Sequence, residues 1–240
     1  MFARSRGAWP GVLLALLAGL PSPSFSATMN DELLARLSST APMLDQTVLK
    51  SAFAAASCAV SHGIEVPERL AVIDFSMPSS EKRMWIFDLE KGELILKDLV
   101  AHGKNSGNFK STSFSNVEGS YQSSIGLFQA RESYFGKHGY SLRLDGLEPG
   151  INDHARDRAI VIHGADYVDE TWVSKYGRIG RSHGCPAVDN DVIKKVVDNL
   201  KGGQLVFKYY PDQTWLHSSS FLNCASKSVA SHSESESERG

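Results

Sequence analysis

Short strand-like runs separated by turn residues fill most of the chain between residues 67 and 211, and they constrain its fold more than any other feature. The runs are RLAVIDFS, RMWIFDL, ELILKDL, SIGLFQARESYFG, YSLRLDGL, RAIVIHGA and QLVFKYYP, and a Glu-Lys-Gly turn joins the second to the third. Many short strands with turn signals between them are typical of a barrel or a sandwich-like sheet, and not of parallel β-α-β units. The sequence therefore predicts a mainly β domain over residues 67–211.

Helical patterns precede this domain and recur once inside it. Residues 30–39 and 44–63 read as helices, so we predict an N-terminal helical segment over residues 27–66, with Gly63 as the stop of the second helix. Inside the domain, Asn190 is expected to cap a helix that ends at Gly202 and Gly203. Its apolar face comprises Val192, Ile193, Val196, Val197 and Leu200. One or two helices are thus expected to pack on the sheet.

Both ends of the chain differ in composition from the middle. Arg4 and Arg6 precede the apolar run GVLLALLAGL, and small residues and prolines follow it, which is typical of a secretory signal peptide. We predict a signal peptide over residues 1–26, because the apolar run is about half of the ~20 residues that span a bilayer. After its cleavage we expect no stable membrane insertion and a periplasmic or otherwise exported protein. Residues 212–240 include SHSESESERG and are predicted to be a disordered low-complexity tail.

Charge and cysteine content narrow the possible functions. A formal net charge of −2 lacks the basic surplus of nucleic-acid-binding proteins, so no nucleic acid partner is expected. The chain has three cysteines, and an exported protein can form disulfides. Cys58 and Cys224 either pair or remain two separate thiols; the sequence leaves both open. An unpaired Cys185 is a candidate reactive thiol.

Cys185 lies in the segment RAIVIHGADYVDETWVSKYGRIGRSHGCPAVD. A cysteine attacks as the thiolate, which requires a nearby base or positive charge. His163, at the end of an apolar run, is the candidate base, while Arg178 and Arg181 supply positive charge. Pro186 has no N–H, so an oxyanion would have to be bound by amides at or before Cys185.

A zinc site and a purely structural role are the alternatives for Cys185. His154, His163, His183 and Cys185 supply enough ligand atoms for zinc, but His183 and Cys185 are closer together than the usual ligand pairs. The residues alone favour a nucleophile and leave the other two interpretations open. We predict no cofactor and no metal.

The stretches IVIHG and GRIGRSHGCPAV together resemble the active-site signature of the L,D-transpeptidase (YkuD-type) catalytic domain. HGKNSG and FSNVEGSYQSSIGLF resemble its murein L,D-transpeptidase branch, and the likeness covers residues 42–210. The resemblance implies an L,D-transpeptidase-like β-sandwich or barrel. It also implies a cysteine that takes an acyl group from a peptidoglycan stem peptide, the expected partner. The oligomeric state is not predicted.

The resemblance assigns roles to individual residues. Cys185 matches the nucleophile and His163 the general base, and the Gly164 position matches the group that orients this histidine. His183 matches a second histidine that lines the site. The amides of Gly184 and Cys185 match the oxyanion donors.

Substrate recognition is where the sequence departs from the family. Many relatives have an arginine two residues after the cysteine, whereas this chain has Ala187. Arg181 or Arg178 would then have to hold a substrate carboxylate, although a solvated loop position suits either equally well. We expect further substrate contacts from Ser182, Tyr121 and Ser124, with Ser182 more structural than chemical. His102, in HGKNSG, is interpreted as a surface histidine.

These expectations lead to an exported cysteine acyltransferase that cross-links peptidoglycan stems through a thioester on Cys185. The alternatives are an L,D-carboxypeptidase or amidase-type hydrolase with the same Cys-His site, and a non-catalytic module that binds the cell wall. A zinc peptidase is a further one.

Overall fold

The computed structural model describes residues 29–224, and the predicted signal peptide over residues 1–26 lies outside this range. Its strands form a single eight-stranded sheet with the order β3-β2-β1-β8-β4-β5-β6-β7. The strands are β1 (Arg69–Asp74), β2 (Met84–Asp88), β3 (Glu93–Asp98), β4 (Gly126–Gly136), β5 (Gly139–Gly146), β6 (Val161–Gly164), β7 (Ala187–Val188) and β8 (Leu205–Tyr209). The pairs β1–β8 and β6–β7 are parallel, and the other neighbours are antiparallel.

The two ends of this sheet approach each other. The chain that follows β3 bridges to the segment that includes β7, through the pairs Ala101–Ala187 and Gly103–Ser182. The Ala101 N–H donates to the Ala187 carbonyl at 2.8 Å. The sheet therefore curves almost into a closed barrel, and the prediction of a mainly β barrel-like fold is confirmed. Its closure brings the segment 101–107 against the Cys185 loop.

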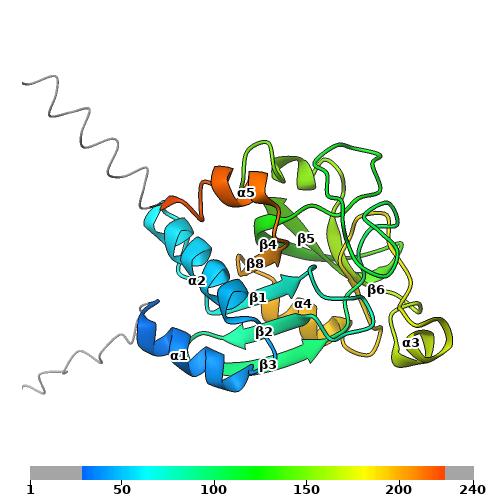
Figure 1. Cartoon of the computed structure of the whole chain (residues 1–240), viewed down its shortest axis with the longest axis horizontal. Helices are drawn as coiled ribbons and strands as arrows, with labels where there is room; N and C mark the ends of the chain where they lie inside the picture. Colours follow the sequence, from blue (N-terminus) through cyan, green and yellow to red (C-terminus); the bar gives the residue numbers. More distant parts are fainter. Residues whose placement is uncertain (1–28, 225–240) are drawn as a thin grey trace, which may run out of the picture.

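The two predicted N-terminal helices form and lie together on one side of the sheet (Figure 1). They are α1 (Asp31–Thr40) and α2 (Gln46–Ser61). Asn30 Oδ1 accepts the Leu33 N–H and Asp45 Oδ1 accepts the Thr47 N–H, so each helix begins at a side-chain cap. Gly63 follows α2 with a φ of +91°, a value that glycine adopts readily.

The helix predicted near residue 190 forms as α4 (Ile193–Leu200), with Val196, Val197 and Leu200 buried. Asn190 does not cap it, contrary to the prediction: the N-cap is Val192, and the Asn190 amide donates to Asp166 instead. Three short elements were not predicted. They are the 3-10 turn η1 (Asp153–Ala155), α3 (Glu170–Tyr176) and β7.

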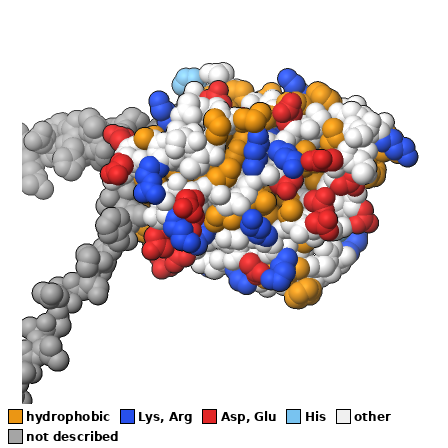
Figure 2. Space-filling view, turned by 90° about the horizontal axis from the view of Figure 1, so that it is seen from below, with side chains coloured by type: hydrophobic (Ala, Val, Ile, Leu, Met, Phe, Trp, Pro, Cys, Tyr) orange, Lys and Arg blue, Asp and Glu red, His pale blue; other side chains and the backbone are white. Residues whose placement is uncertain are grey.

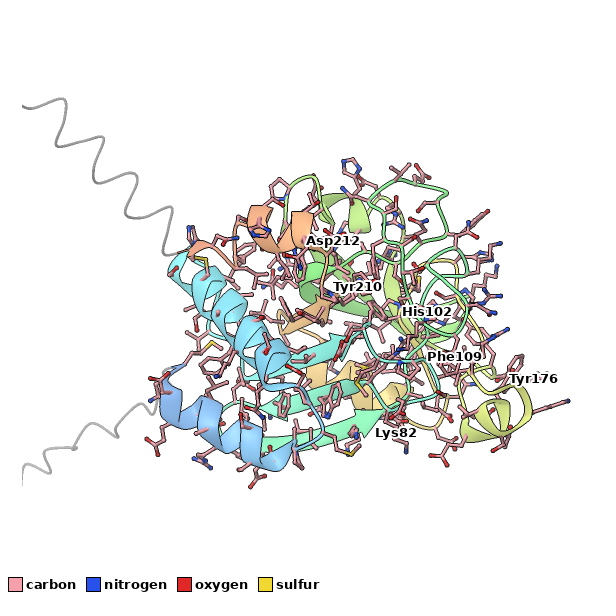
Figure 3. The ribbon with its side chains drawn as sticks, in the orientation of Figure 1. Lys82, His102, Phe109, Tyr176, Tyr210 and Asp212 are labelled. Carbon is pink, nitrogen blue, oxygen red and sulfur yellow. A yellow bond between two sulfur atoms is a disulfide. The ribbon has the colours of Figure 1, made fainter. Side chains whose placement is uncertain are left out.

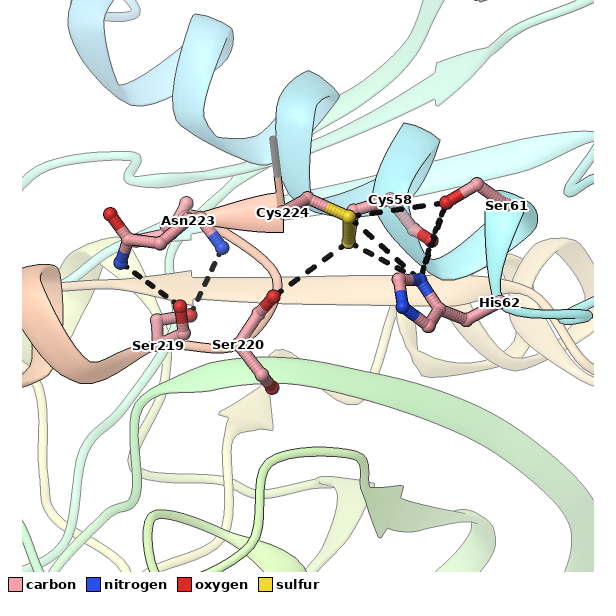
Figure 4. The surroundings of a disulfide bond; sticks show 8 residues. Cys58, Ser61, His62, Ser219, Ser220, Asn223 and Cys224 are labelled. Atoms are coloured by element: carbon pink, nitrogen blue, oxygen red, sulfur yellow. Dashed lines mark hydrogen bonds between the residues drawn. A yellow bond between two sulfur atoms is a disulfide. The ribbon is translucent and has the colours of Figure 1, made fainter. Parts of the chain in front are cut away.

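The predicted start of the tail at residue 212 is too early, because α5 (Gln213–Ser218) follows it directly. Trp215 of α5 is 1% exposed, and its indole N–H donates to Glu148 Oε2 at 3.0 Å. Cys224 forms a disulfide with Cys58 of α2, which resolves the open question of their pairing (Figure 4). The segment up to residue 224 is thus tied to the domain by both packing and a covalent bond, and the rest of the predicted tail lies outside the described residues.

The surface of residues 29–224 has no dominant charge on the face seen in Figure 2, where acidic and basic side chains are interspersed. No helix in this part of the chain is long and apolar enough to cross a membrane.

Candidate active site

The Cys185 loop (residues 181–186) directly precedes β7 and is held on one side by the segment after β3. The Ser182 N–H donates to the His102 carbonyl at 2.9 Å, and the Lys104 N–H donates to the Ser182 carbonyl at 2.8 Å. His102 is fully buried, with Nδ1 2.8 Å from Arg83 Nη2, so its prediction as a surface histidine is wrong (Figure 3). The HGKNSG motif thus supports the loop that carries Cys185.

A tight turn presents Cys185 at the end of this loop. The Ser182 hydroxyl accepts the Gly184 N–H at 3.0 Å and donates to the Cys185 carbonyl at 2.6 Å. Gly184 has a φ of +121°, and a Cβ placed there would lie 2.8 Å from the Gln122 carbonyl oxygen. Only glycine satisfies both the backbone conformation and the close approach of the neighbouring chain.

This turn corrects one of the two predicted oxyanion donors. The Gly184 N–H is already bound by Ser182, so it does not point at a substrate. Within residues 29–224 no hydrogen bond from the Cys185 N–H is found, and Pro186 has no N–H to offer. Of the two predicted oxyanion donors, the Cys185 N–H is therefore the one left unengaged among the described residues.

The Cys185 thiol is half-buried between two strands' ends and unpaired by any disulfide. Its Sγ accepts the Val161 N–H at 3.5 Å and lies 3.7 Å from the Ala159 carbonyl. Burial raises the pKa of the thiol, while the Val161 N–H and the positive charges of Lys208 and Arg158 act to lower that pKa.

His163 lies on β6, two residues after Val161, whose N–H contacts the Cys185 thiol. Its side chain is only 4% exposed, and its Nδ1 lies 2.8 Å from the carbonyl of Gly164. Because a carbonyl only accepts, Nδ1 carries the proton and Nε2 is left as the basic nitrogen. Burial lowers the pKa of His163, so the neutral imidazole is favoured. No hydrogen bond joins His163 to the thiol in residues 29–224.

The predicted substrate residues fall into two groups. His183, an exposed residue of the Cys185 loop, lies beside Tyr121 with ring centroids 4.6 Å apart, and Lys104 Nζ lies 4.1 Å from the Tyr121 centroid. Ser124 is 1% exposed and its hydroxyl has no partner among the described residues, so it does not face a peptide cleft. Its neighbour Ser123 instead binds the Gly184 carbonyl at 3.1 Å.

Both candidate arginines bind backbone carbonyls. Arg181 Nη1 donates to the carbonyls of Lys104 and Gly107 at 3.2 and 3.1 Å, and Arg178 Nη1 donates to the Ile179 carbonyl at 2.8 Å. Arg181 thus joins the Cys185 loop to the segment after β3, whereas Arg178 binds only the carbonyl of the next residue. Ala187 pairs with His163 across β6 and β7 and is fully buried in a small apolar cluster. A long cationic side chain has no space at position 187.

A cavity of about 370 Å³ beside His163 was not predicted from the sequence. It is lined by Lys137, His138, Gly164, Ala165, Asp166, Tyr167 and Asn190. The imidazole of His138 stacks on that of His163, with centroids 4.4 Å apart. His138 lies in the turn between β4 and β5, and nothing in its local sequence indicates proximity to residue 163.

The four ligands of the zinc interpretation are not brought together. In residues 29–224 the group of His, Cys, Asp and Glu side chains close enough to hold an ion is Cys58, His62 and Cys224, at the disulfide. His154 lies exposed in η1.

A model of the family described as the L,D-transpeptidase catalytic domain (YkuD_2) matches residues 40–209. A search of curated proteins finds no match. Similar solved structures include an L,D-transpeptidase from Mycobacterium smegmatis (16% identity, 60% of this chain and 59% of that chain, TM-score 0.37). An L,D-transpeptidase from Stackebrandtia nassauensis is 12% identical over 74% of this chain and 76% of that chain, with a TM-score of 0.36.

A mutant of the helical cell shape determining protein Pgp2 from Campylobacter jejuni is 13% identical over 66% of this chain and 55% of that chain, with a TM-score of 0.37. The chain thus spans 59% of the mycobacterial protein's length and 55% of the Campylobacter protein's length.

Proposed function

The chain belongs to the L,D-transpeptidase catalytic-domain family, and on that premise we propose that it is an exported cysteine acyltransferase that acts on peptidoglycan stem peptides. The observation that carries the proposal is the pairing of β6 with β7. This pairing sets His163 beside β7, the strand that begins two residues after Cys185. Cys185 is a free cysteine, and the Gly164 carbonyl fixes the tautomer of His163.

In the first half of the reaction, the Cys185 thiolate attacks the carbonyl carbon of the L-centred residue in a tetrapeptide stem. The Cys185 N–H donates to the oxyanion that forms. His163 Nε2 takes the thiol proton and gives it to the nitrogen of the terminal D-amino acid as the C–N bond breaks. A thioester on Cys185 and a free D-amino acid result.

In the second half, an amine of a neighbouring stem attacks the thioester carbonyl and passes a proton to His163. The C–S bond breaks, Cys185 leaves as the thiolate, and the new amide is a cross-link. Water in place of the amine gives a hydrolysed stem, which is the carboxypeptidase alternative. Dividing one amide exchange into two acyl transfers is the advantage of a covalent intermediate.

Export is part of the proposal and has independent support. A disulfide that persists, such as Cys58–Cys224, is typical of proteins outside the reducing cytosol. Action on peptidoglycan would place the protein in the cell envelope, in the periplasm or beyond it.

Incubation of the purified protein with defined tetrapeptide muropeptides, followed by mass spectrometry, tests the proposal. Cross-linked dimers are expected, together with a protein adduct of the thioester mass that is absent from Cys185→Ala. Free D-amino acid without dimers would indicate the hydrolase, and unchanged muropeptides would favour a wall-binding module. A product yield that Cys185→Ala retains, or that a chelator abolishes, would overturn the cysteine mechanism.

A further inference from the structure

The imidazole of His163 is held by one hydrogen bond and one ring contact. Its Nδ1 donates to the Gly164 carbonyl at 2.8 Å, and the His138 ring stacks on it with centroids 4.4 Å apart and planes at 27°. The χ2 torsion of a histidine has broad preferences, and a single hydrogen bond leaves the ring free to turn about that bond. The stacked ring of His138 therefore supplies the second restraint on the plane of the His163 imidazole.

Strand pairing brings His138 to this position. Ser141 of β5 pairs with His163 of β6, and His138 lies three residues before Ser141, in the turn that joins β4 to β5. Gly136 and Gly139 pair across this turn, and Gly139 has a φ of +71°, which glycine adopts readily. The tight turn thus places the His138 side chain beside His163, where the two rings meet.

His138 acts on the site through this ring contact. In residues 29–224 its imidazole makes no hydrogen bond and no ion pair. His138 is exposed, whereas His163 is 4% exposed. The His138 ring therefore separates one face of the candidate base from solvent.

Space into which the base would turn lies next to the stack. The cavity of about 370 Å³ is lined by His138 and, in the segment from the end of β6, by Gly164, Ala165 and Asp166. Loss of the His138 ring would add its volume to this cavity and leave no atoms in contact with that face of the imidazole. The His163 ring would then have room to turn out of its present plane.

We propose that His138 is a positioning residue for the general base: its ring fixes the plane of the His163 imidazole and with it the direction of Nε2. One direction serves both half-reactions, because Nε2 takes up and returns a proton in each. Misplacement of a reacting group by about 1 Å costs about 10²-fold in rate, so this restraint contributes to turnover. The inference rests on the proposed function in taking His163 as the base.

Steady-state kinetics on tetrapeptide muropeptides test this role through the split between kcat and KM. His138→Ala should lower kcat about 10- to 100-fold and leave KM within about twofold, because the ring acts on the base. His138→Phe keeps the ring without its nitrogens and should retain most of the wild-type kcat. His154→Ala, at an exposed histidine in η1, is the matched control and should leave both constants unchanged.

NMR of the isotope-labelled protein without substrate separates this inference from the proposed transpeptidation. The Nδ1–H of His163, bound to the Gly164 carbonyl, should give a slowly exchanging resonance that His163→Gln lacks. His138→Ala should broaden or remove this resonance, and His138→Phe should keep it. A folded His138→Ala that keeps the wild-type resonance would overturn the proposal, even if the wild type proved inactive on muropeptides.

The kinetic data offer two further ways to reject the role. If His138→Phe were as impaired in kcat as His138→Ala, the ring contact would not be the cause. A rise in KM with an unchanged kcat in His138→Ala would make His138 a substrate contact, and the positioning role would be wrong.

Discussion

Ser182 holds the backbone around Cys185 in place through two hydrogen bonds of its one hydroxyl, accepting from the Gly184 N–H at 3.0 Å and donating to the Cys185 carbonyl at 2.6 Å. The sequence motif Ser-His-Gly-Cys is thus a structural unit in which the serine fixes the backbone on both sides of the glycine. The consequence is that the direction of the Cys185 N–H depends on the Ser182 side chain.

Replacement of Ser182 by alanine should therefore impair activity without removing any reacting group. Two buried partners lose their hydrogen bonds, which costs about 1–3 kcal/mol each in comparable cases. We expect kcat/KM on muropeptides to fall by about 10- to 100-fold, which corresponds to a rise of about 1.4 to 2.7 kcal/mol in the activation free energy. Ser182→Thr, which retains the hydroxyl, should recover most of this loss. Equal activity of Ser182→Ala and the wild type would show that the turn holds without the hydroxyl.

Gly184→Ala should disrupt the same loop by a different cause. The new Cβ would lie 2.8 Å from the Gln122 carbonyl oxygen, and the backbone has a φ of +121°. Such strain costs about 1–3 kcal/mol, which urea unfolding should show as a lower free energy of unfolding, with a loss of Cys185 alkylation.

Gly119→Ala is the matched control for that variant. Gly119 also has a positive φ, +72°, but its Cβ would meet nothing within 4 Å. Its free energy of unfolding should fall by only about 1 kcal/mol, the cost of placing alanine in a left-handed backbone conformation. If both alanine variants were destabilised alike, close contact with Gln122 would not be the cause.

The pH dependence of activity should report the protonation of His163. Burial lowers its pKa below the ordinary value of 6.5, so the imidazole stays neutral and able to accept a proton at pH values below 6.5. The acidic limb of a plot of kcat/KM against pH should therefore lie below 6.5. Protonation of Nε2 at still lower pH removes the base and ends activity.

His163→Gln should lower kcat by about 10²- to 10⁴-fold, the usual contribution of a general base. His154→Gln, at an exposed histidine in η1, is the control and should leave kcat unchanged. If the acidic limb of the wild-type plot of kcat/KM against pH lay above 6.5, burial would not be holding the His163 imidazole neutral.

Reduction of the Cys58–Cys224 disulfide should destabilise the protein. The two cysteines are 166 residues apart, so the bond closes a loop that contains almost the whole domain. Loss of a native disulfide costs about 2–5 kcal/mol. We expect dithiothreitol to lower the free energy of unfolding by this amount in urea titrations.

The double variant Cys58→Ser/Cys224→Ser should have the lowered stability from the start and should not respond to dithiothreitol. Its Cys185 alkylation rate should remain that of the wild type, because the disulfide joins α2 to the residues after α5 and does not touch the Cys185 loop. A wild-type stability that dithiothreitol leaves unchanged would show that this bond does not hold the fold.

The sequence by itself determined most of the strands and the local turn around Cys185. Alternating and β-branched runs predicted β1 to β6 and β8, because each run must bury apolar side chains on a sheet. The Ser-His-Gly-Cys motif and the preceding histidine indicated Cys185 and His163, because the turn is formed by residues that are adjacent in the chain.

Only the tertiary structure decided which polar groups meet across the fold. The engagement of Arg181 by the carbonyls of Lys104 and Gly107 depends on how the 101–107 segment closes the sheet. The stacking of His138 on His163 is not encoded locally, since the turn between β4 and β5 and the strand β6 are distant in the sequence. Lys208 in the run LVFKYY is fully buried, which the run itself does not reveal, because a strand pattern does not decide whether a lysine faces water or the interior.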